Sequence, residues 1–252
     1  MEPSLQIKNV SKSFGSLRAI DDVSFSVGDK SVTILIGPNG SGKTTMINVI
    51  GGFYPPDSGF VMYQGLPITG LAPHEVYRRG LVRTFQIPSL FWRMTVLENV
   101  MAAKKDNPGE AFSKAVFKRM WKEAETETAE QAFGVLEIVG LLKIWDQPAN
   151  SLSGGQMKLL EIGRALMSGA KTILMDEPIS GVNPTLAHGI FAKLLQLRDE
   201  YGITFLIVEH RLDIALSYVD EVVAMSYGKL VATGSPKEVM SDARVVEAYL
   251  GG

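Results

Sequence analysis

The chain has 252 residues, of which 46% are hydrophobic and 21% are charged, and its formal net charge is −2 at pH 7. This length and apolar content suffice for a substantial core in one domain that carries an insertion. The balanced charge gives no indication of nucleic-acid binding, and the lack of cysteine excludes disulfides and thiolate metal sites and fits a reducing compartment.

The N-terminus carries neither the basic nor the long apolar segment of a secretion signal. No uninterrupted apolar run approaches the roughly 18 residues of a membrane helix, so we expect a cytosolic protein that cannot cross a bilayer alone. Short β-rich segments then occupy the start of the chain, with one more after the first helix. These segments are LQIKNV, VSFSV, SVTILIG and GFVMYQG.

A glycine-rich loop, GPNGSGKT from Gly37 to Thr44, follows the apolar strand VTILI and precedes a helical segment. Glycines let the backbone wrap closely, so its N–H groups and the helix N-terminus point at phosphate oxygens. In this pattern Lys43 reaches the β- and γ-phosphates of a nucleotide, and the Thr44 hydroxyl is a ligand of Mg²⁺. The nucleotide-binding residues expected here are Asn39, Gly40, Ser41, Gly42, Lys43, Thr44 and Thr45.

Gln86 ends a further expected strand, in RTFQIPSLF, and the chain then becomes helical from about Thr95 to Leu142. Charged stretches in that segment carry apolar residues at three- and four-residue spacing. We interpret it as a helical insertion in a single domain. The expected division is a core of residues 1–94 and 155–252, with an α-helical subdomain at residues 95–154.

A second glycine-rich helix start, SLSGGQMKLLEIGRAL, begins at Ser151, and its Ser153 and Gln156 fit a capping box. Capping alone does not explain Gly154 and Gly155, because glycine costs about 1 kcal/mol relative to alanine within a helix. An anion that approaches the backbone would explain them. We therefore hypothesise that in a two-fold dimer Ser153, Gly154, Gly155 and Gln156 complete the nucleotide site of the other copy.

The strands KTILMD and TFLIVEH flank a helix from about Pro184 to Tyr201, and this alternation predicts a parallel α/β sheet. Asp176 and Glu177 end the first of these strands, at the edge where ligands of α/β proteins bind. Asp176 would hold the metal, directly or through water, and Glu177 would polarise the attacking water. Taken alone, the two carboxylates could instead cap a turn.

His210 ends the second strand, TFLIVEH, as Gln86 ends the earlier one. By itself each is an ordinary polar strand end, but together they are candidates to sense the γ-phosphate. Gln86 also joins Thr44 and Asp176 as a candidate metal ligand, and the catalytic set becomes Lys43, Gln86, Glu177 and His210.

The motifs GPNGSGKTT, Gln86, LSGGQ, ILMDEP and His210 stand in the order found in ATP-binding subunits of ABC transporters, which the chain resembles over nearly its whole length. The stretches RTFQIPSLFWRMTVLENV, MKLLEIGRAL, IVEHRLDIAL and VVEAYLGG look most like the ATPases of branched-chain amino acid importers. The resemblance implies a P-loop NTPase core with a parallel sheet, an N-terminal antiparallel β subdomain and an inserted α-helical subdomain. It also implies hydrolysis of ATP to ADP and phosphate, with ATP and Mg²⁺ bound, to drive transport.

The resemblance adds roles that the residues alone do not give. It implies that Phe14 stacks on adenine, that Ser153 and Gly155 touch the other subunit's γ-phosphate, and that the loop from Ser180 to Pro184 crosses the dimer interface. Asn183 departs from the aspartate usual in the wider family, which puts an interfacial salt bridge in doubt. Phe14 replaces a commoner tyrosine, a change that should alter stacking little.

The implied partners are a second copy or a homologous ATPase subunit, transmembrane permease subunits and, indirectly, an extracytoplasmic solute-binding protein, with no nucleic acid. Such a subunit lies peripherally on the cytoplasmic face of the membrane. We expect permeases to dock near Gln86 and the segment Leu90 to Met94, although Phe91 and Trp92 could equally be core residues.

Four alternative classes follow from the same motifs. An ATPase of an exporter, such as a lipopolysaccharide transporter, is the runner-up. A chromosome-maintenance or repair ATPase would need a long coiled coil, for which the span from Gln86 to Leu152 is too short. A translation-associated ABC protein usually carries two cassettes, and a P-loop kinase or GTPase would not need LSGGQ.

Overall fold

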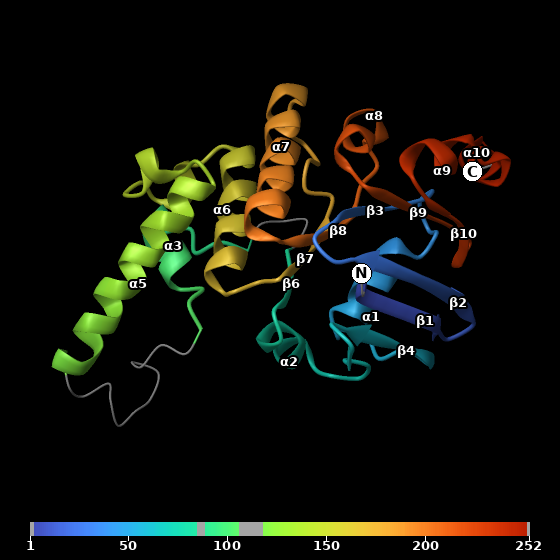
Figure 1. Cartoon of the computed structure of the whole chain (residues 1–252), viewed down its shortest axis with the longest axis horizontal. Helices are drawn as coiled ribbons and strands as arrows, with labels where there is room; N and C mark the ends of the chain where they lie inside the picture. The colour runs from blue at the N-terminus through green and yellow to red at the C-terminus, as the bar shows by residue number, and fades with distance from the viewer. Residues whose placement is uncertain (1–2, 85–88, 106–117, 251–252) are drawn as a thin grey trace. The chain divides into compact units, whose positions relative to one another are not determined.

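The computed structural model describes residues 3–84, 89–105 and 118–250. It divides into two compact units, one of Met1–Gln86 with Lys171–Gly252 and the other of Ile87–Ala170 (Figure 1). The expected helical subdomain covered only residues 95–154. The second unit therefore begins earlier and ends later than the sequence division, and it includes the helix that follows the second glycine-rich loop.

The first unit contains a four-stranded sheet in the order β2-β1-β4-β5, in which all neighbours are antiparallel. Along β1 the buried Leu5 and Ile7 pair with the buried Val27 and Phe25 of β2, because alternate side chains of a strand share one face. The predicted antiparallel subdomain is confirmed. Its strands are β1 (Pro3–Phe14), β2 (Leu17–Gly28), β4 (Ser58–Tyr63) and β5 (Leu66–Pro67).

The same unit contains a six-stranded sheet in the order β10-β9-β3-β8-β7-β6. The five strands from β9 to β6 are parallel, as predicted, whereas β10 runs antiparallel at the edge. Every residue of β3, β7 and β8 is buried, which is typical of a parallel sheet covered on both faces. The strands are β3 (Val32–Ile36), β6 (Leu81–Arg83), β7 (Thr172–Asp176), β8 (Thr204–Val208), β9 (Glu221–Ser226) and β10 (Lys229–Gly234).

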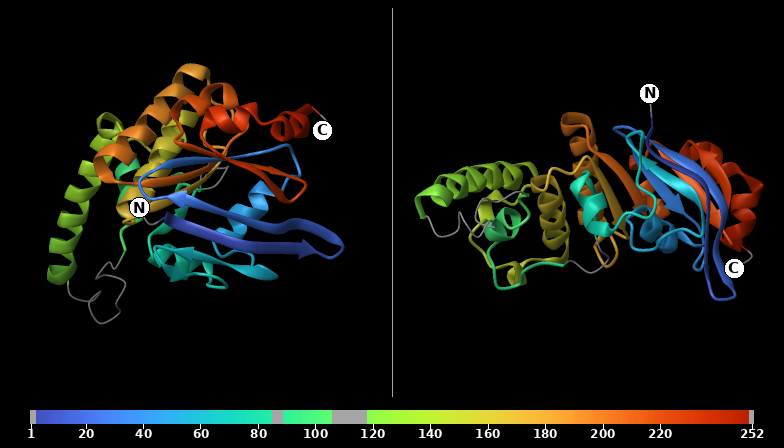
Figure 2. Two further views of the ribbon diagram at one scale, coloured as in Figure 1. Left: turned by 45° about the vertical axis from the view of Figure 1, so that its right-hand side comes forward. Right: turned by 90° about the horizontal axis from the view of Figure 1, so that it is seen from below.

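Helix α1 (Lys43–Ile50) lies between the two sheets (Figures 1 and 2), where its Met46 and Ile47 share one apolar core with residues of both. Helix α7 (Pro184–Tyr201) has the predicted bounds and buries Phe191 and Leu194. The remaining helices of this unit are α2 (Pro73–Arg78), α8 (Leu212–Ala215), α9 (Pro236–Ser241) and α10 (Ala243–Leu250), with a 3-10 turn at Leu216–Tyr218.

The second unit is helical, with α3 (Val96–Met101), α5 (Lys118–Ile138), α6 (Gly154–Met167) and 3-10 turns at Leu142–Ile144 and Ala149–Ser151. The helices approach closely at Gly163 of α6. A Cβ there would lie 3.5 Å from Val135 of α5 and 3.7 Å from Val100 of α3, which explains why α6 belongs to this unit. Nowhere in the described residues is a helix both long and apolar enough to span a membrane.

Candidate functional site

The predicted succession of strand, glycine-rich loop and helix is confirmed at β3 and α1. Two glycines of the loop are required by the chain's own fold. A Cβ on Gly37 (φ +149°) would lie 2.1 Å from the carbonyl oxygen of Met225, and one on Gly42 (φ +99°) would lie 2.5 Å from that of Ala19. The loop is therefore held in its tight path by close contact with neighbouring backbone.

Lys43, at the start of α1, is buried and folded back on the loop. Its Nζ donates hydrogen bonds of 2.9 Å to the carbonyl oxygens of Gly37 and Pro38. Burial lowers the pKa of Lys43, while the nearby carboxylates of Glu177 and Asp176 act in the opposite direction. The ammonium group thus lies at the mouth of the loop, where an arriving phosphate would replace the carbonyl oxygens as its partner.

A pocket of about 420 Å³ opens at this loop. It combines the loop with the ends of β7 and β8, so eight of the predicted site residues meet there. Leu17, Arg18, Ala19 and Tyr227 complete the lining, and sequence reasoning missed them because they come from the start of β2 and from the β9–β10 turn, far from the loop in the sequence. The lining residues are Leu17, Arg18, Ala19, Asn39, Gly40, Gly42, Lys43, Thr44, Thr45, Glu177, His210 and Tyr227.

Three other predicted residues lie elsewhere or outside the description. Ser41 belongs to the loop but its side chain is buried, with the Oγ 3.4 Å from the Lys43 Nζ. Phe14 does not line the pocket; it is 43% exposed at the end of β1 and packs edge-on against Tyr54. Gln86 lies outside the described residues.

Glu177 and His210 meet at the ends of adjacent parallel strands. The Glu177 Oε1 lies 3.2 Å from the His210 Nε2, and the Glu177 N–H donates to the Val208 carbonyl at 2.8 Å. Glu177 has a φ of +50°, a left-handed conformation that is uncommon for a residue with a Cβ. Such backbone strain concentrates at functional sites, and here it turns the carboxylate toward the pocket.

Asp176, the last residue of β7, is buried and pairs with Arg83 of β6 at 3.3 Å. Burial raises the pKa of Asp176, and the Arg83 guanidinium partly offsets that rise. Arg83 also donates to Asn48 Oδ1 at 2.5 Å, and Asn48 Nδ2 donates to the Thr44 carbonyl at 2.7 Å. In the sequence this network is indicated only by an arginine that follows two apolar residues in LVR, and the motifs did not include that arginine.

The Thr44 hydroxyl and the Asp176 carboxylate are oxygen donors, the kind of ligand that Mg²⁺ takes. No group of three or more His, Cys, Asp and Glu side chains that could hold a metal occurs among the described residues. Two oxygen donors fit an ion that completes its shell with nucleotide phosphates and water, which is how Mg²⁺ is usually bound.

The second glycine-rich loop has the predicted capping box at the start of α6. The Ser153 Oγ accepts from the Gln156 N–H at 3.4 Å, and the Gln156 Oε1 accepts from the Ser153 N–H at 2.8 Å. Gly154 is exposed, and a Cβ there would meet no described atom within 4 Å. The N–H groups of the first turn have no partner within the helix itself, and of the two glycines only Gly154 is exposed, since Gly155 is buried.

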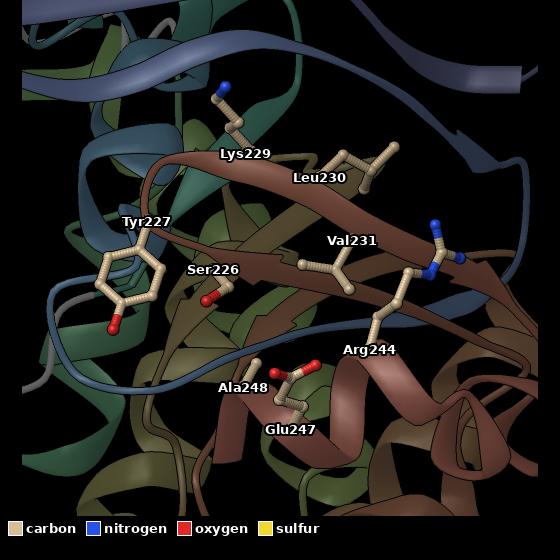
Figure 3. Close-up of a pocket in the computed structure, with 8 residues that line it drawn as sticks. All are labelled: Ser226, Tyr227, Lys229, Leu230, Val231, Arg244, Glu247 and Ala248. Atoms are coloured by element: carbon tan, nitrogen blue, oxygen red, sulfur yellow. The ribbon is translucent and has the colours of Figure 1, made fainter. Parts of the chain in front are cut away.

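A further pocket of about 500 Å³ lies between the β9–β10 hairpin and α10 (Figure 3). Tyr227 lines both this pocket and the one at the phosphate-binding loop. Both cationic residues that line the pocket beside α10 are already paired, Lys229 with Asp21 at 3.3 Å and Arg244 with Asp242 at 2.6 Å. None of the predicted site residues lies here.

Comparison with known proteins agrees with this geometry. Residues 20–180 match the family model for ABC transporters, and residues 229–252 match that for branched-chain amino acid ATP-binding cassette transporters. The chain is 50% identical to a probable branched-chain amino acid transport ATP-binding protein LivG of Methanocaldococcus jannaschii, covering 98% of this chain and 97% of that one. A protein of the same name from Archaeoglobus fulgidus is 48% identical, with 98% and 95% covered.

Solved structures extend the comparison to three dimensions. A nucleotide-free ATP-binding cassette from an ABC transporter has a TM-score of 0.86, is 49% identical and is covered over 100% of both chains. A dimeric cassette in a post-hydrolysis state with ADP and Pi has a TM-score of 0.73 and is 25% identical, with 92% of this chain and 98% of that chain covered. Together with the loop, strand-end carboxylates and capped glycine loop described above, these matches show that the chain belongs to the ABC transporter family of ATP-hydrolysing cassettes.

Proposed function

We propose that the chain hydrolyses ATP at sites shared by two copies, in which Ser153 to Gln156 of one copy close over the nucleotide held by Gly37 to Thr45 of the other. One observation carries this proposal: the exposed Gly154 leaves the first turn of α6 without a side chain, although nothing described in its own chain requires a glycine there. A helix N-terminus with unpaired N–H groups attracts phosphate.

In this site each residue has a distinct task. Lys43 and the N–H groups of the first turn of α1 hold the β- and γ-phosphates, because those N–H groups have no partner within the helix. Glu177 accepts the proton of the attacking water, and His210, 3.2 Å away, orients that carboxylate. Thr44 and Asp176 would hold Mg²⁺, which when bound neutralises phosphate charge. Positioning and charge stabilisation then suffice without a covalent intermediate.

The need for two copies can be tested by how activity depends on protein concentration. A site built from two chains loses activity on dilution, so ATPase activity per mole of chain should rise with protein concentration at saturating ATP. The dimeric state of the solved cassette with ADP and Pi supports this expectation. Constant activity per mole across concentrations at which sedimentation shows only monomers would contradict the proposal.

The segment from Leu90 to Met94 is the proposed docking surface for membrane permeases. Phe91 and Trp92 are 48% and 45% exposed, so the alternative that they are core residues is wrong. The buried Asn99 holds the segment in place, because its side chain accepts from the Phe91 N–H and donates to the Phe91 carbonyl. Trp92→Ala should leave the ATPase activity of the isolated subunit intact and weaken its assembly with permeases; equal loss of both would oppose docking.

The transported substrate is proposed from the relatives. The archaeal proteins above are named for branched-chain amino acid transport, as is a high-affinity protein of Escherichia coli K12 that is 31% identical. These names favour an importer over the lipopolysaccharide exporter that was the runner-up. A peripheral place on the cytoplasmic face and an indirect link to a solute-binding protein complete the proposal. The test is uptake of labelled leucine by cells that produce this chain together with its membrane permease subunits. Uptake should be present with the wild-type chain and absent with Glu177→Gln.

A further inference from the structure

Glu209 is a buried carboxylate that none of the motifs accounts for. It follows β8 directly, between Val208 and His210, and is only 2% exposed. No lysine, arginine or histidine among the described residues forms an ion pair with it. A buried carboxylate is stable only if hydrogen bonds replace its lost hydration, so its partners explain why it is there.

Those partners are three backbone N–H groups from two different loops. The Glu209 Oε1 accepts from Ile179 at 3.0 Å, and the Oε2 accepts from His210 at 3.0 Å and from Arg211 at 3.3 Å. Ile179 lies two residues beyond Glu177, whereas His210 follows the other strand. One side chain therefore connects the loop after β7 to the loop after β8.

A second contact joins the same loops. The Arg211 guanidinium donates to the Val182 carbonyl at 3.2 Å, three residues further along the first loop. Ile179 is fully buried, so its N–H has no water to use in place of Glu209. The Glu209 carboxylate and the Arg211 guanidinium thus fix the two loops to each other at both ends of the segment from Ile179 to Val182.

This connection lies beside the catalytic pair. Glu177 and His210 are held 3.2 Å apart by the ends of two strands, and Glu177 keeps a strained left-handed backbone. Strained conformations persist only where the surroundings over-determine them. The loop that leaves Glu177 and the backbone of His210 are the two parts that Glu209 binds.

We propose that Glu209 is a positioning residue for ATP hydrolysis: it clamps the loop after Glu177 to the backbone of His210 and so keeps the Glu177–His210 pair in its reactive geometry. The inference rests on the proposed function, because it assigns hydrolysis to that pair. Glu209 itself touches neither nucleotide phosphates nor water in this role. It acts through the backbone on either side.

Glu209→Gln is the sharpest variant, since glutamine has nearly the same shape but only one acceptor oxygen. Its NH₂ group faces an N–H donor and cannot bind it. Misplacement of the catalytic pair should lower kcat by on the order of tenfold to a hundredfold. The phosphate-binding loop is untouched, so the Kd for ATP in the isolated subunit should change less than about twofold.

Ser4→Ala is the matched control. Ser4 is also buried and bonds Thr172 at 2.9 Å, at the opposite end of β7 from the site. The control removes a buried hydrogen bond of similar burial without touching either loop, so kcat should remain at the wild-type value. Hydrogen exchange followed by mass spectrometry supplies the structural readout, and peptides that contain Ile179 should exchange faster in Glu209→Gln alone.

The outcomes separate the inference from the proposed function. If the wild-type chain fails to hydrolyse ATP, the proposed function itself is contradicted. If the wild type hydrolyses ATP but Glu209→Gln keeps its kcat, or loses no more than Ser4→Ala does, the clamp is contradicted. A lower kcat without faster exchange near Ile179 would also overturn it, because the loss would then arise elsewhere.

Discussion

The two glycine-rich loops differ in what their glycines are for. In the loop before α1, Gly37 and Gly42 are required by backbone atoms of the same chain, which a Cβ would meet at 2.1 and 2.5 Å. In the loop before α6, Gly154 faces open space and the helix is already capped by Ser153. The first loop is held by its own fold, whereas nothing described in the chain requires a glycine at position 154.

The N-termini of the two helices that follow these loops, α1 and α6, also differ in how they are capped. Helix α1 has Gly42 as its N-cap and therefore no side-chain cap, and Lys43 is buried and turned back onto the loop. Helix α6 is stabilised by a reciprocal capping box, and its first two N–H groups have no partner within the helix itself. The same capping box also begins α3 and α9, so the exposed Gly154 is what distinguishes the start of α6.

The largest effect is expected from Glu177→Gln, which removes the chemistry and leaves both loops unchanged. Without a general base, kcat should fall by a factor on the order of 100 or more. ATP binding, measured by isothermal titration, should stay within about threefold of wild type because Lys43 and its loop are intact. A Glu177→Gln protein with near-normal turnover would show that another residue activates the water.

Arg83→Met tests how much the buried ion pair between Arg83 and Asp176, beside the phosphate-binding loop, contributes to the stability of the fold. Loss of the guanidinium leaves the buried Asp176 carboxylate unpaired, and the free energy of unfolding should fall by about 3 kcal/mol at pH 7. Arg198→Met is the control: its partners Asp199 and Asp220 are both largely exposed, so that loss should stay below about 1 kcal/mol.

The pH dependence of Arg83→Met gives the sign of the effect. Arg83 lowers the pKa of Asp176, so its loss raises that pKa further. The penalty for an unpaired carboxylate applies above this folded-state pKa and is relieved as the pH falls through it. The stability gap to wild type, from urea denaturation, should therefore narrow as the pH is lowered from 7 toward 5; a gap that widens would contradict the pairing.

Gly154→Glu separates the two uses of the second loop. A carboxylate in the first turn of α6 favours the helix, and with the loss of glycine it should stabilise the chain by about 1 kcal/mol. The same charge would repel a phosphate from the other copy, so ATPase activity should fall on the order of tenfold. Gly134→Glu is the control, since Gly134 of α5 also faces open space. It should raise stability and leave activity unchanged.

The smallest effect is expected at a third helix start, where Asp242 precedes α10. The Arg244 side chain and N–H lower the pKa of Asp242 to about 2. A depressed carboxyl pKa contributes stability above the ordinary value, and that contribution is lost as the pH falls toward about 2. Melting temperatures should place Asp242→Asn slightly below wild type at pH 7 and equal to it near pH 2.

Much of this fold follows from local signals in the sequence. The strand and turn around Gly37 to Thr44, the capping box of Ser153 and Gln156, and the helix from Pro184 to Tyr201 are all confirmed. Each depends on residues that lie close to one another in the sequence. The strands β9 and β10 were not among the predicted strands, and nothing within a short segment indicates that β10 runs antiparallel at the edge of a mixed sheet.

The unpredicted parts of the site depend on partners far apart in the chain. Arg83 pairs with Asp176, and Glu209 bonds Ile179, only because β6, β7 and β8 lie side by side. The unit boundary likewise follows from the packing of Gly163 against α3 and α5. The motifs indicated the chemistry, but they could not show which neighbouring side chains hold it in place.

The most direct test of the shared site is sedimentation of Glu177→Gln with saturating ATP, alone and combined with Gly154→Glu or Gly134→Glu. We predict a stable dimer for Glu177→Gln and for its combination with Gly134→Glu, and a monomer when Gly154→Glu is present. A Glu177→Gln protein that remains monomeric, or a dimer that persists unchanged with Gly154→Glu, would contradict the account.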